Sequence, residues 1–210
     1  MDKTQMTILA YDKHCNAYAK KFMSFSPYAG RIEEFAQWLS EGAKVLDVGC
    51  GPGNTAKHLL AQKPLELIGF DLSAEMVSLA RQNVQGGIFY VQDSREAQFP
   101  EQSFDAIILS FCIVHLTHEE ACSLLKKAAQ WLKPGGLVYV SFMEGKEKGF
   151  ETTSFSEDPI FFNYFSSNEV VELLKREQVE PFSLAKQDYP EQDGTVTTDV
   201  FIFGRKKQLP

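Results

Sequence analysis

Three glycines at alternate positions, Gly49, Gly51 and Gly53, have the spacing in this chain that points most directly to chemistry. They follow a short apolar run at residues 45–48 and precede a helical pattern at residues 55–60. A residue without a side chain lets the backbone turn sharply and approach a bound ligand closely. The order strand, glycine turn, helix is typical of a nucleotide-cofactor site in an α/β sheet.

The details of this turn bear on which cofactor it binds. The dinucleotide pattern G-x-G-x-x-G requires a last glycine where this chain has Asn54, and Pro52 removes a backbone N–H that a phosphate would use. Asp71 ends a second apolar run about 20 residues after the middle glycine, where a carboxylate accepts hydrogen bonds from ribose hydroxyls. The pattern therefore indicates a ribose and weakens, without excluding, a pyrophosphate.

Apolar runs alternate with helical patterns along the chain, which favours an α/β fold with a mainly parallel sheet. Thr117 and Glu120 form a capping-box pattern, and Ser167 is expected to cap a later helix. A long loop is expected at residues 144–158 and a turn at 191–194. The expected helices are 11–25, 31–39, 55–60, 73–84, 117–132 and 166–177, and the expected strands are 45–48, 65–70, 88–92, 105–110, 137–142, 182–188 and 197–204.

Composition excludes several classes of protein. A length of 210 residues predicts one domain, and a net charge of −7 disfavours nucleic acid as a partner. No apolar run approaches the roughly 20 residues that cross a bilayer, and the polar start of the chain predicts no signal peptide. The four cysteines include no C-x-x-C pair, so we expect reduced thiols and no metal. A cytoplasmic protein without membrane contact is the resulting prediction.

From Val45 to about Phe142 the sequence resembles the class I S-adenosylmethionine-dependent methyltransferases. The resemblance implies a Rossmann-like three-layer sandwich with a mostly parallel seven-stranded sheet and an antiparallel last strand. It also implies one domain with an N-terminal helical cap (1–40), a cofactor-binding core (45–142), an acceptor-side loop (143–165) and a C-terminal helix with strands (166–210). The matching segments, correctly ordered and spaced, are 45–54, 68–73 with Met76, 92–94, 104–110 and 132–136.

The resemblance also implies roles around the methionine and ribose parts of S-adenosylmethionine. Asp47 would orient the glycine loop and reach the methionine ammonium, and Ser110 would offer its carbonyl to the amino-acid part. The backbone at Gly49 and Gly51 would face the methionine and ribose, and Asp71 would bind the ribose hydroxyls. Together with Asp93, the carboxylates of Asp47 and Asp71 would surround one crevice. Three carboxylates suit a sulfonium cation and would repel a pyrophosphate.

Four further residues are implied for the adenosine end of the cofactor. Leu72 and Met76 would pack against the adenine or the sugar. Asp93 would accept a hydrogen bond from the adenine amino group, with the backbone amide of Ser94 nearby. The product of methyl transfer would be S-adenosylhomocysteine, and no metal ligand is implied.

The sequence gives fewer indications of which residues face the methyl acceptor. His115 lies just past the fourth expected strand and is the candidate general base, with a packing or capping histidine as the alternative. Tyr18 is a candidate contact for the methionine part, whereas Tyr11 is interpreted as part of the buried stripe of its helix. The pair of His115 and His118 is interpreted as incidental rather than metal-binding. An aromatic group, either lining an acceptor pocket or filling the core, comprises Phe155, Phe161, Phe162, Tyr164 and Phe165.

The leading hypothesis is methyl transfer from S-adenosylmethionine to a small-molecule acceptor. A nicotinamide-dependent oxidoreductase is the alternative in another reaction class. Against this alternative, the chain lacks the last glycine of the dinucleotide fingerprint and has no Tyr-x-x-x-Lys pair. A non-catalytic cofactor-binding subunit is the third hypothesis. Neither the acceptor atom nor the oligomeric state follows from the sequence.

Overall fold

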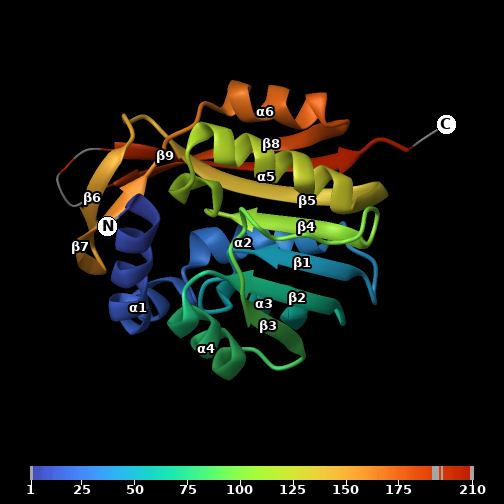
Figure 1. Cartoon of the computed structure of the whole chain (residues 1–210). Helices are drawn as coiled ribbons and strands as arrows, with labels where there is room; N and C mark the ends of the chain where they lie inside the picture. The colour runs from blue at the N-terminus through green and yellow to red at the C-terminus, as the bar shows by residue number, and fades with distance from the viewer. Residues whose placement is uncertain (1, 191–193, 195, 209–210) are drawn as a thin grey trace.

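The computed structural model describes residues 2–190, 194 and 196–208, and within them seven strands form one sheet in the order β3-β2-β1-β4-β5-β9-β8 (Figure 1). Strands β1 to β5 pair in parallel, and the last strand, β9, runs antiparallel between β5 and β8. The expected fold class is confirmed. The strand bounds are β1 Lys44–Val48, β2 Glu66–Asp71, β3 Gly87–Val91, β4 Phe104–Ser110, β5 Leu132–Glu144, β8 Val179–Pro190 and β9 Val196–Lys206.

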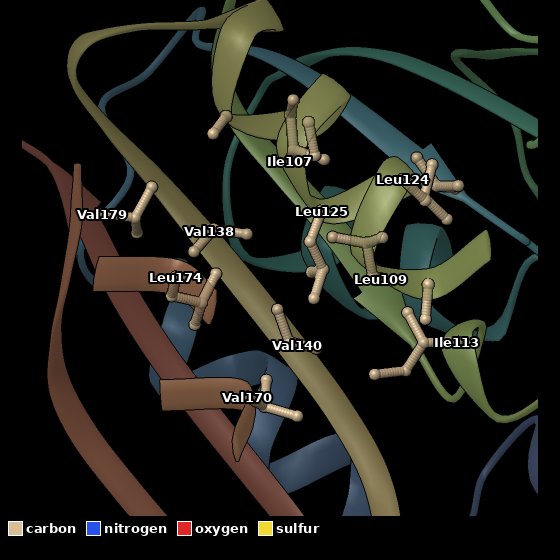
Figure 2. Close-up of a cluster of buried hydrophobic side chains, with 14 of the residues drawn as sticks. Ile107, Leu109, Ile113, Leu124, Leu125, Val138, Val140, Val170, Leu174 and Val179 are labelled. Carbon is tan, nitrogen blue, oxygen red and sulfur yellow. The ribbon is translucent and has the colours of Figure 1, made fainter. Parts of the chain in front are cut away.

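Helices cover both faces of this sheet because its central strands are apolar on both sides. On β1, Val45 packs into one buried cluster with α2 (Ser26–Ala36), α3 (Asn54–Gln62) and α4 (Ala74–Asn83). Its neighbour Leu46 faces the opposite cluster, which includes α5 (His118–Trp131) and α6 (Ser167–Arg176). Figure 2 shows part of the second cluster, with side chains of both helices against β4 and β5. Within the described residues, the helices are too short or too polar to span a bilayer.

Side-chain caps fix where α1, α5 and α6 begin. The capping box of Thr117 and Glu120 is confirmed, with a bond of 3.2 Å from the Glu120 amide to the Thr117 hydroxyl. The last helix is capped by Ser166 rather than by Ser167, because the Ser166 hydroxyl accepts from the Glu169 amide at 3.2 Å. The first helix, α1 (Lys3–Phe22), begins earlier than expected because the Asp2 carboxylate caps it.

The segment expected as an acceptor-side loop at residues 143–165 contains a β-hairpin instead. Strand β5 continues to Glu144, and β6 (Gly149–Thr153) pairs antiparallel with β7 (Ser156–Phe162). The polar composition hid the pairing, which is stabilised by the cross-strand contact of Phe150 and Phe161, with ring centroids 5.7 Å apart. The expected turn at 191–194 falls mostly outside the described residues.

Gly53 is required by packing as well as by backbone conformation. Its φ is +86°, and a Cβ there would lie 2.6 Å from Val84 Cγ2 on the end of α4. We expect Gly53→Ala to lower the free energy of unfolding by about 1–3 kcal/mol, measured by urea denaturation. Gly42→Ala is the control, because Gly42 has a φ of +72° with open space around it. Equal losses in both variants would show that packing against α4 contributes nothing.

Candidate active site

The carboxyl ends of β1, β2 and β4 meet at one edge of the sheet, beneath α1, around a cavity of about 220 Å³. This is where ligands bind in open α/β sheets. Ten of the eleven site residues predicted from the sequence line this cavity, and only Asp47 does not. The ten are Tyr18, Gly49, Gly51, Asp71, Leu72, Met76, Asp93, Ser94, Ser110 and His115.

Asp71 holds the glycine loop in place. Its Oδ2 accepts a hydrogen bond from the Gly51 amide and its Oδ1 accepts one from the Ser73 amide, each at 2.9 Å. Burial raises the pKa of Asp71, and these backbone bonds oppose the rise by favouring the carboxylate. The carboxylate is therefore fixed at the end of β2, where it faces the cavity with lone pairs left to accept further donors.

Asp47 lies on β1 directly before the glycine loop, and its side chain is completely buried. Among the described residues neither carboxylate oxygen has a hydrogen-bond partner. Burial, with a smaller contribution from the charge of Asp71, raises its pKa to about 7. Asp47 makes no hydrogen bond to the glycine loop among the described residues, and the Gly51 amide donates to Asp71 instead. A buried carboxylate without a partner is costly, and a cationic group beside it would relieve the cost.

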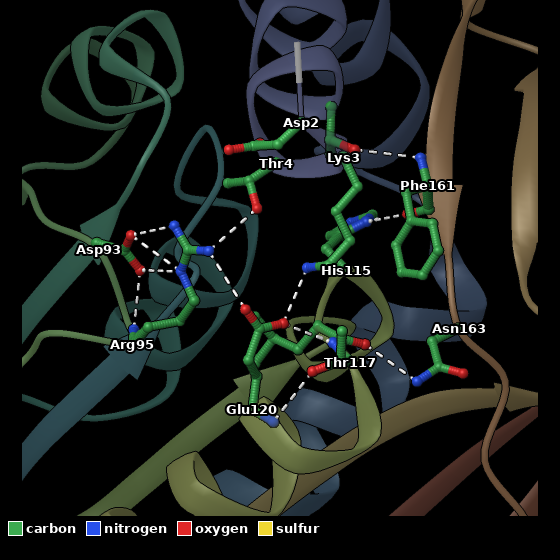
Figure 3. A network of polar contacts seen from close by, with 12 residues as sticks. Asp2, Lys3, Thr4, Asp93, Arg95, His115, Thr117, Glu120, Phe161 and Asn163 are labelled. Atoms are coloured by element: carbon green, nitrogen blue, oxygen red, sulfur yellow. Dashed lines mark hydrogen bonds and ion pairs between the residues drawn. The ribbon is translucent and has the colours of Figure 1, made fainter.

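Asp93 is bound by a residue that the sequence analysis missed, Arg95 (Figure 3). Arg95 Nη2 lies 2.6 Å from Asp93 Oδ2, and Nε lies 3.0 Å from both carboxylate oxygens. Burial raises the pKa of Asp93, but the bonds from Arg95 outweigh it and the net pKa is lowered. Arg95 also contacts Glu120 at 3.3 Å and Thr4 on α1 at 3.2 Å. In the sequence, the only local indication of this pairing is that Arg95 lies two residues after Asp93.

His115 is fixed by two hydrogen bonds that define its tautomer. Nδ1 lies 3.0 Å from the Phe161 carbonyl oxygen, which only accepts, so Nδ1 carries the proton. Nε2 therefore accepts from the Tyr11 hydroxyl at 3.0 Å. Burial lowers the pKa of His115 to about 4, so the ring is neutral near pH 7. The interpretation of Tyr11 as helix packing alone is wrong, because it lines the cavity and pairs with this histidine.

The two histidines do not share a site. His118 Nδ1 lies 2.8 Å from a Glu169 carboxylate oxygen on α6, and its side chain is mostly exposed. Among the residues with described positions, no group of three or more His, Cys, Asp or Glu side chains is arranged to hold a metal ion.

Aromatic side chains line part of the cavity. Of the five aromatic residues singled out at 155–165, Phe155, Phe162 and Tyr164 line the cavity. Phe161 and Phe165 are buried elsewhere in the fold. The sequence analysis missed other lining residues because they come from segments that only the fold brings together. They include Lys21, Phe22, Tyr28, Phe111, Tyr189 and Asp199.

Comparison with known proteins agrees with this geometry. Residues 45–136 match a family model described as a methyltransferase domain. Phosphoethanolamine N-methyltransferase 3 of Arabidopsis thaliana is 35% identical over 107 residues, covering 49% of this chain and 21% of that protein. A phosphoethanolamine N-methyltransferase of Plasmodium falciparum is 33% identical over 113 residues, covering 52% of this chain and 42% of that protein. The chain thus spans less than half the length of these curated relatives.

One solved structure is similar over nearly the whole chain. It is phosphoethanolamine N-methyltransferase 2 of Haemonchus contortus, in complex with phosphomonomethylethanolamine and S-adenosylhomocysteine. The TM-score is 0.76 at 16% identity, with 99% of this chain and 61% of that chain covered. Residues 45–136 are thus similar to the methyltransferase-domain family, and the fold is that of the solved S-adenosylmethionine-dependent methyltransferases.

Proposed function

We propose that this protein transfers a methyl group from S-adenosylmethionine to a small-molecule acceptor and releases S-adenosylhomocysteine. The observation that carries the proposal is the Asp47 carboxylate, completely buried beside the glycine loop and without a hydrogen-bond partner among the described residues. Asp47 does not line the cavity, and the methionine ammonium of S-adenosylmethionine beside the glycine loop would supply the cation that this carboxylate lacks, partly through water. A pyrophosphate at the same place would add negative charge next to Asp47 and Asp71.

The residues around the cavity fit the rest of this cofactor. The fixed Asp71 carboxylate suits two ribose hydroxyls, and the close approach of the backbone at Gly49 and Gly51 suits the ribose and methionine. The apolar side chains of Leu72 and Met76 suit the adenine face. Both Asp93 oxygens accept hydrogen bonds from Arg95, so an adenine amino group would share this carboxylate with Arg95, with Ser94 beside it. Ser110 would offer its carbonyl, and Tyr18 would cover the methionine.

The Tyr11–His115 pair is the proposed route for a proton leaving the acceptor. When bound, the cofactor supplies the electrophilic methyl group. The Tyr11 oxygen would take a proton from the acceptor as its own proton moves to the neutral Nε2 of His115. The bond from His115 Nδ1 to the Phe161 carbonyl keeps the ring oriented for that transfer.

The acceptor is proposed to be a small molecule held within the cavity. The net charge of −7 is unfavourable for binding a nucleic acid. The names of the curated relatives make phosphoethanolamine the first acceptor to assay. The four cysteines are free, which supports the proposal that the protein acts in the cytoplasm.

Calorimetry with S-adenosylmethionine, S-adenosylhomocysteine and NAD tests the proposed cofactor. We expect micromolar binding of the first two and none of NAD. Tight binding of NAD alone would instead favour the nicotinamide-dependent oxidoreductase. Cofactor binding without methyl transfer to any acceptor, screened by the mass of one added methyl group, would favour a non-catalytic subunit.

Asp71→Ala is expected to weaken S-adenosylmethionine binding by about 1–3 kcal/mol, because a charged hydrogen-bond acceptor is lost. The loss includes loosening of the glycine loop, since the Gly51 amide loses its partner. Calorimetry measures the effect, and Asp188→Ala, at an exposed position on β8, is the matched control. An unchanged affinity in Asp71→Ala would show that Asp71 is not the ribose ligand.

A further inference from the structure

The β6–β7 hairpin reaches the cavity through its turn. Its far end is anchored next to His115, because the Asn163 amide donates to the Val114 carbonyl at 2.7 Å and the Asn163 side chain donates to the Leu116 carbonyl at 3.0 Å. At the other end, the residues at and before the turn line the cavity; they are Thr152, Thr153, Ser154 and Phe155. The turn therefore carries one large apolar side chain, Phe155, into the site, and Phe162 lines the cavity from the far end of β7.

Contacts along α1 hold the hairpin over the cavity. The Phe161 amide donates to Thr7 Oγ1 at 3.1 Å. Asp158 Oδ2 on β7 lies 2.7 Å from both Lys13 Nζ and His14 Nε2. Helix α1 and the hairpin thus form one cover, and Figure 1 shows them side by side at the same end of the sheet.

The Phe155 ring packs against three aromatic side chains of α1. It stacks on Tyr11, with centroids 5.8 Å apart and planes 25° apart, and meets Tyr18 edge to face at 5.0 Å. It also lies 6.0 Å from Phe22. Tyr11 is the residue whose hydroxyl bonds to His115, so Phe155 fills space directly beside that pair.

The turn itself does not require a phenylalanine. Thr153 Oγ1 accepts from the Phe155 amide at 3.3 Å and from the Ser156 amide at 3.1 Å, which closes the turn through backbone donors. Turn positions of this kind favour small polar residues. The half-buried ring at 155 therefore serves the cavity, and its removal leaves the bonds that fold the hairpin in place.

We propose that Phe155 is a specificity-determining residue, which limits the acceptor beside Tyr11 and His115 to molecules that leave room for its ring. As an assignment of acceptor size, this inference rests on the proposed function. The wall that it completes is aromatic, so the acceptors selected carry an apolar or ammonium-bearing end that fits against ring faces. A smaller residue at position 155 would admit acceptors larger by about one ring.

The test compares wild type, Phe155→Ala and Phe155→Leu, each saturated with S-adenosylhomocysteine. Fluorine NMR measures the binding of a one-ring probe, fluorobenzylamine, and a two-ring probe, fluorotryptamine. We expect Phe155→Ala to bind the two-ring probe about ten-fold more tightly than wild type, because an apolar space of ring size binds a ring. The matched control is Phe150→Ala, whose exposed ring contacts Phe161 on the same hairpin without lining the cavity.

Calorimetry with S-adenosylhomocysteine separates this inference from the proposed function. If wild type and both Phe155 variants bind it equally but the two-ring probe shows no preference for Phe155→Ala, the specificity role is refuted. If wild type does not bind it, the proposed function fails as well. If Phe155→Ala does not fold, as judged by thermal unfolding, Phe155→Leu carries the test with a smaller gain expected.

Discussion

His115→Ala is expected to lower kcat for methyl transfer by about 10²–10⁴-fold, the range that one general acid–base group contributes. The reason is the geometry of the pair, in which neutral Nε2 accepts from Tyr11 at 3.0 Å inside the cavity. Affinity for S-adenosylhomocysteine should stay within about three-fold, because His115 is proposed to act on the acceptor alone. Steady-state kinetics with the acceptor found by mass shift, together with calorimetry, measure both quantities.

Three variants separate catalysis from packing. His118→Ala removes a mostly exposed histidine three positions away and should leave kcat unchanged. His115→Asn preserves a donor for the Phe161 carbonyl but removes the acceptor for Tyr11, so it should lose turnover without a large loss of stability. Tyr11→Phe should lower kcat in the same direction. Full turnover in a folded His115→Asn protein would assign His115 to packing.

The pH dependence of this step follows from the lowered pKa of His115, about 4. The neutral, proton-accepting form predominates above that pH. Between pH 8 and pH 5, His115 should therefore cause no loss of kcat. A decline with an apparent pKa near the ordinary value for histidine, about 6.5, would contradict the buried, neutral ring.

Asp47→Asn is expected to stabilise the cofactor-free protein at pH 8 while abolishing most of its affinity for S-adenosylmethionine. The folded-state pKa of about 7 lies above the ordinary 3.8, so the folded chain holds this proton more tightly than the unfolded chain does. The contribution of Asp47 to stability is complete below pH 3.8, falls as the pH rises, and is lost above pH 7. The shift corresponds to an upper limit of about 4 kcal/mol.

Urea denaturation at pH 5 and pH 8 measures this effect. The advantage of Asp47→Asn over wild type should grow by about 2–3 kcal/mol between the two pH values, since the neutral amide carries no charge to bury. Asp105→Asn is the control of opposite sign. Asp105 accepts from the Lys44 amide at 2.9 Å and from Lys133 at 2.7 Å, and these bonds outweigh burial and lower its pKa. The Asp105→Asn variant should therefore be less stable than wild type at pH 8.

The cofactor half of the Asp47 experiment has its own outcome. If the carboxylate is the partner of the methionine ammonium, wild-type affinity should rise with pH through about 7 as the carboxylate ionises, and Asp47→Asn should lose that dependence. Retained affinity and the same pH dependence in the variant would exclude Asp47 as the ammonium partner.

The sequence predicted what local spacing determines. The glycine turn at 49–53 and the Thr117–Glu120 capping box each lie within a few residues, so their types and positions suffice. The seven-stranded sheet followed from the alternation of patterns and from the resemblance. The hairpin was missed because one of its faces packs against α1, a contact that no local pattern records.

The site contacts that escaped prediction depend on side-chain geometry in three dimensions. The hydroxyl of Tyr11 meets His115, which follows 104 residues later, and helical periodicity alone gave Tyr11 a packing role. The sequence assigns Asp93 to a ligand. The structure shows that its carboxylate is also paired with Arg95 in a bidentate geometry. Asp47 lies on the predicted strand, but its absence from the cavity lining and its lack of partners are visible only in three dimensions.

The division of the cavity between two parts of the chain has an evolutionary consequence. Most residues proposed to face the cofactor, such as Asp71, lie within the matched domain at 45–136, whereas Tyr11, Phe155 and Tyr189, which also line the cavity, lie outside it. Changes in the hairpin or at the end of β8 would therefore alter the choice of acceptor while the proposed cofactor residues stay intact, whereas α1 also carries Tyr18, the proposed methionine contact. Descendants of such a protein can diverge in substrate by replacing its flanking segments, and exchanging those segments between homologues offers the same route to engineered selectivity.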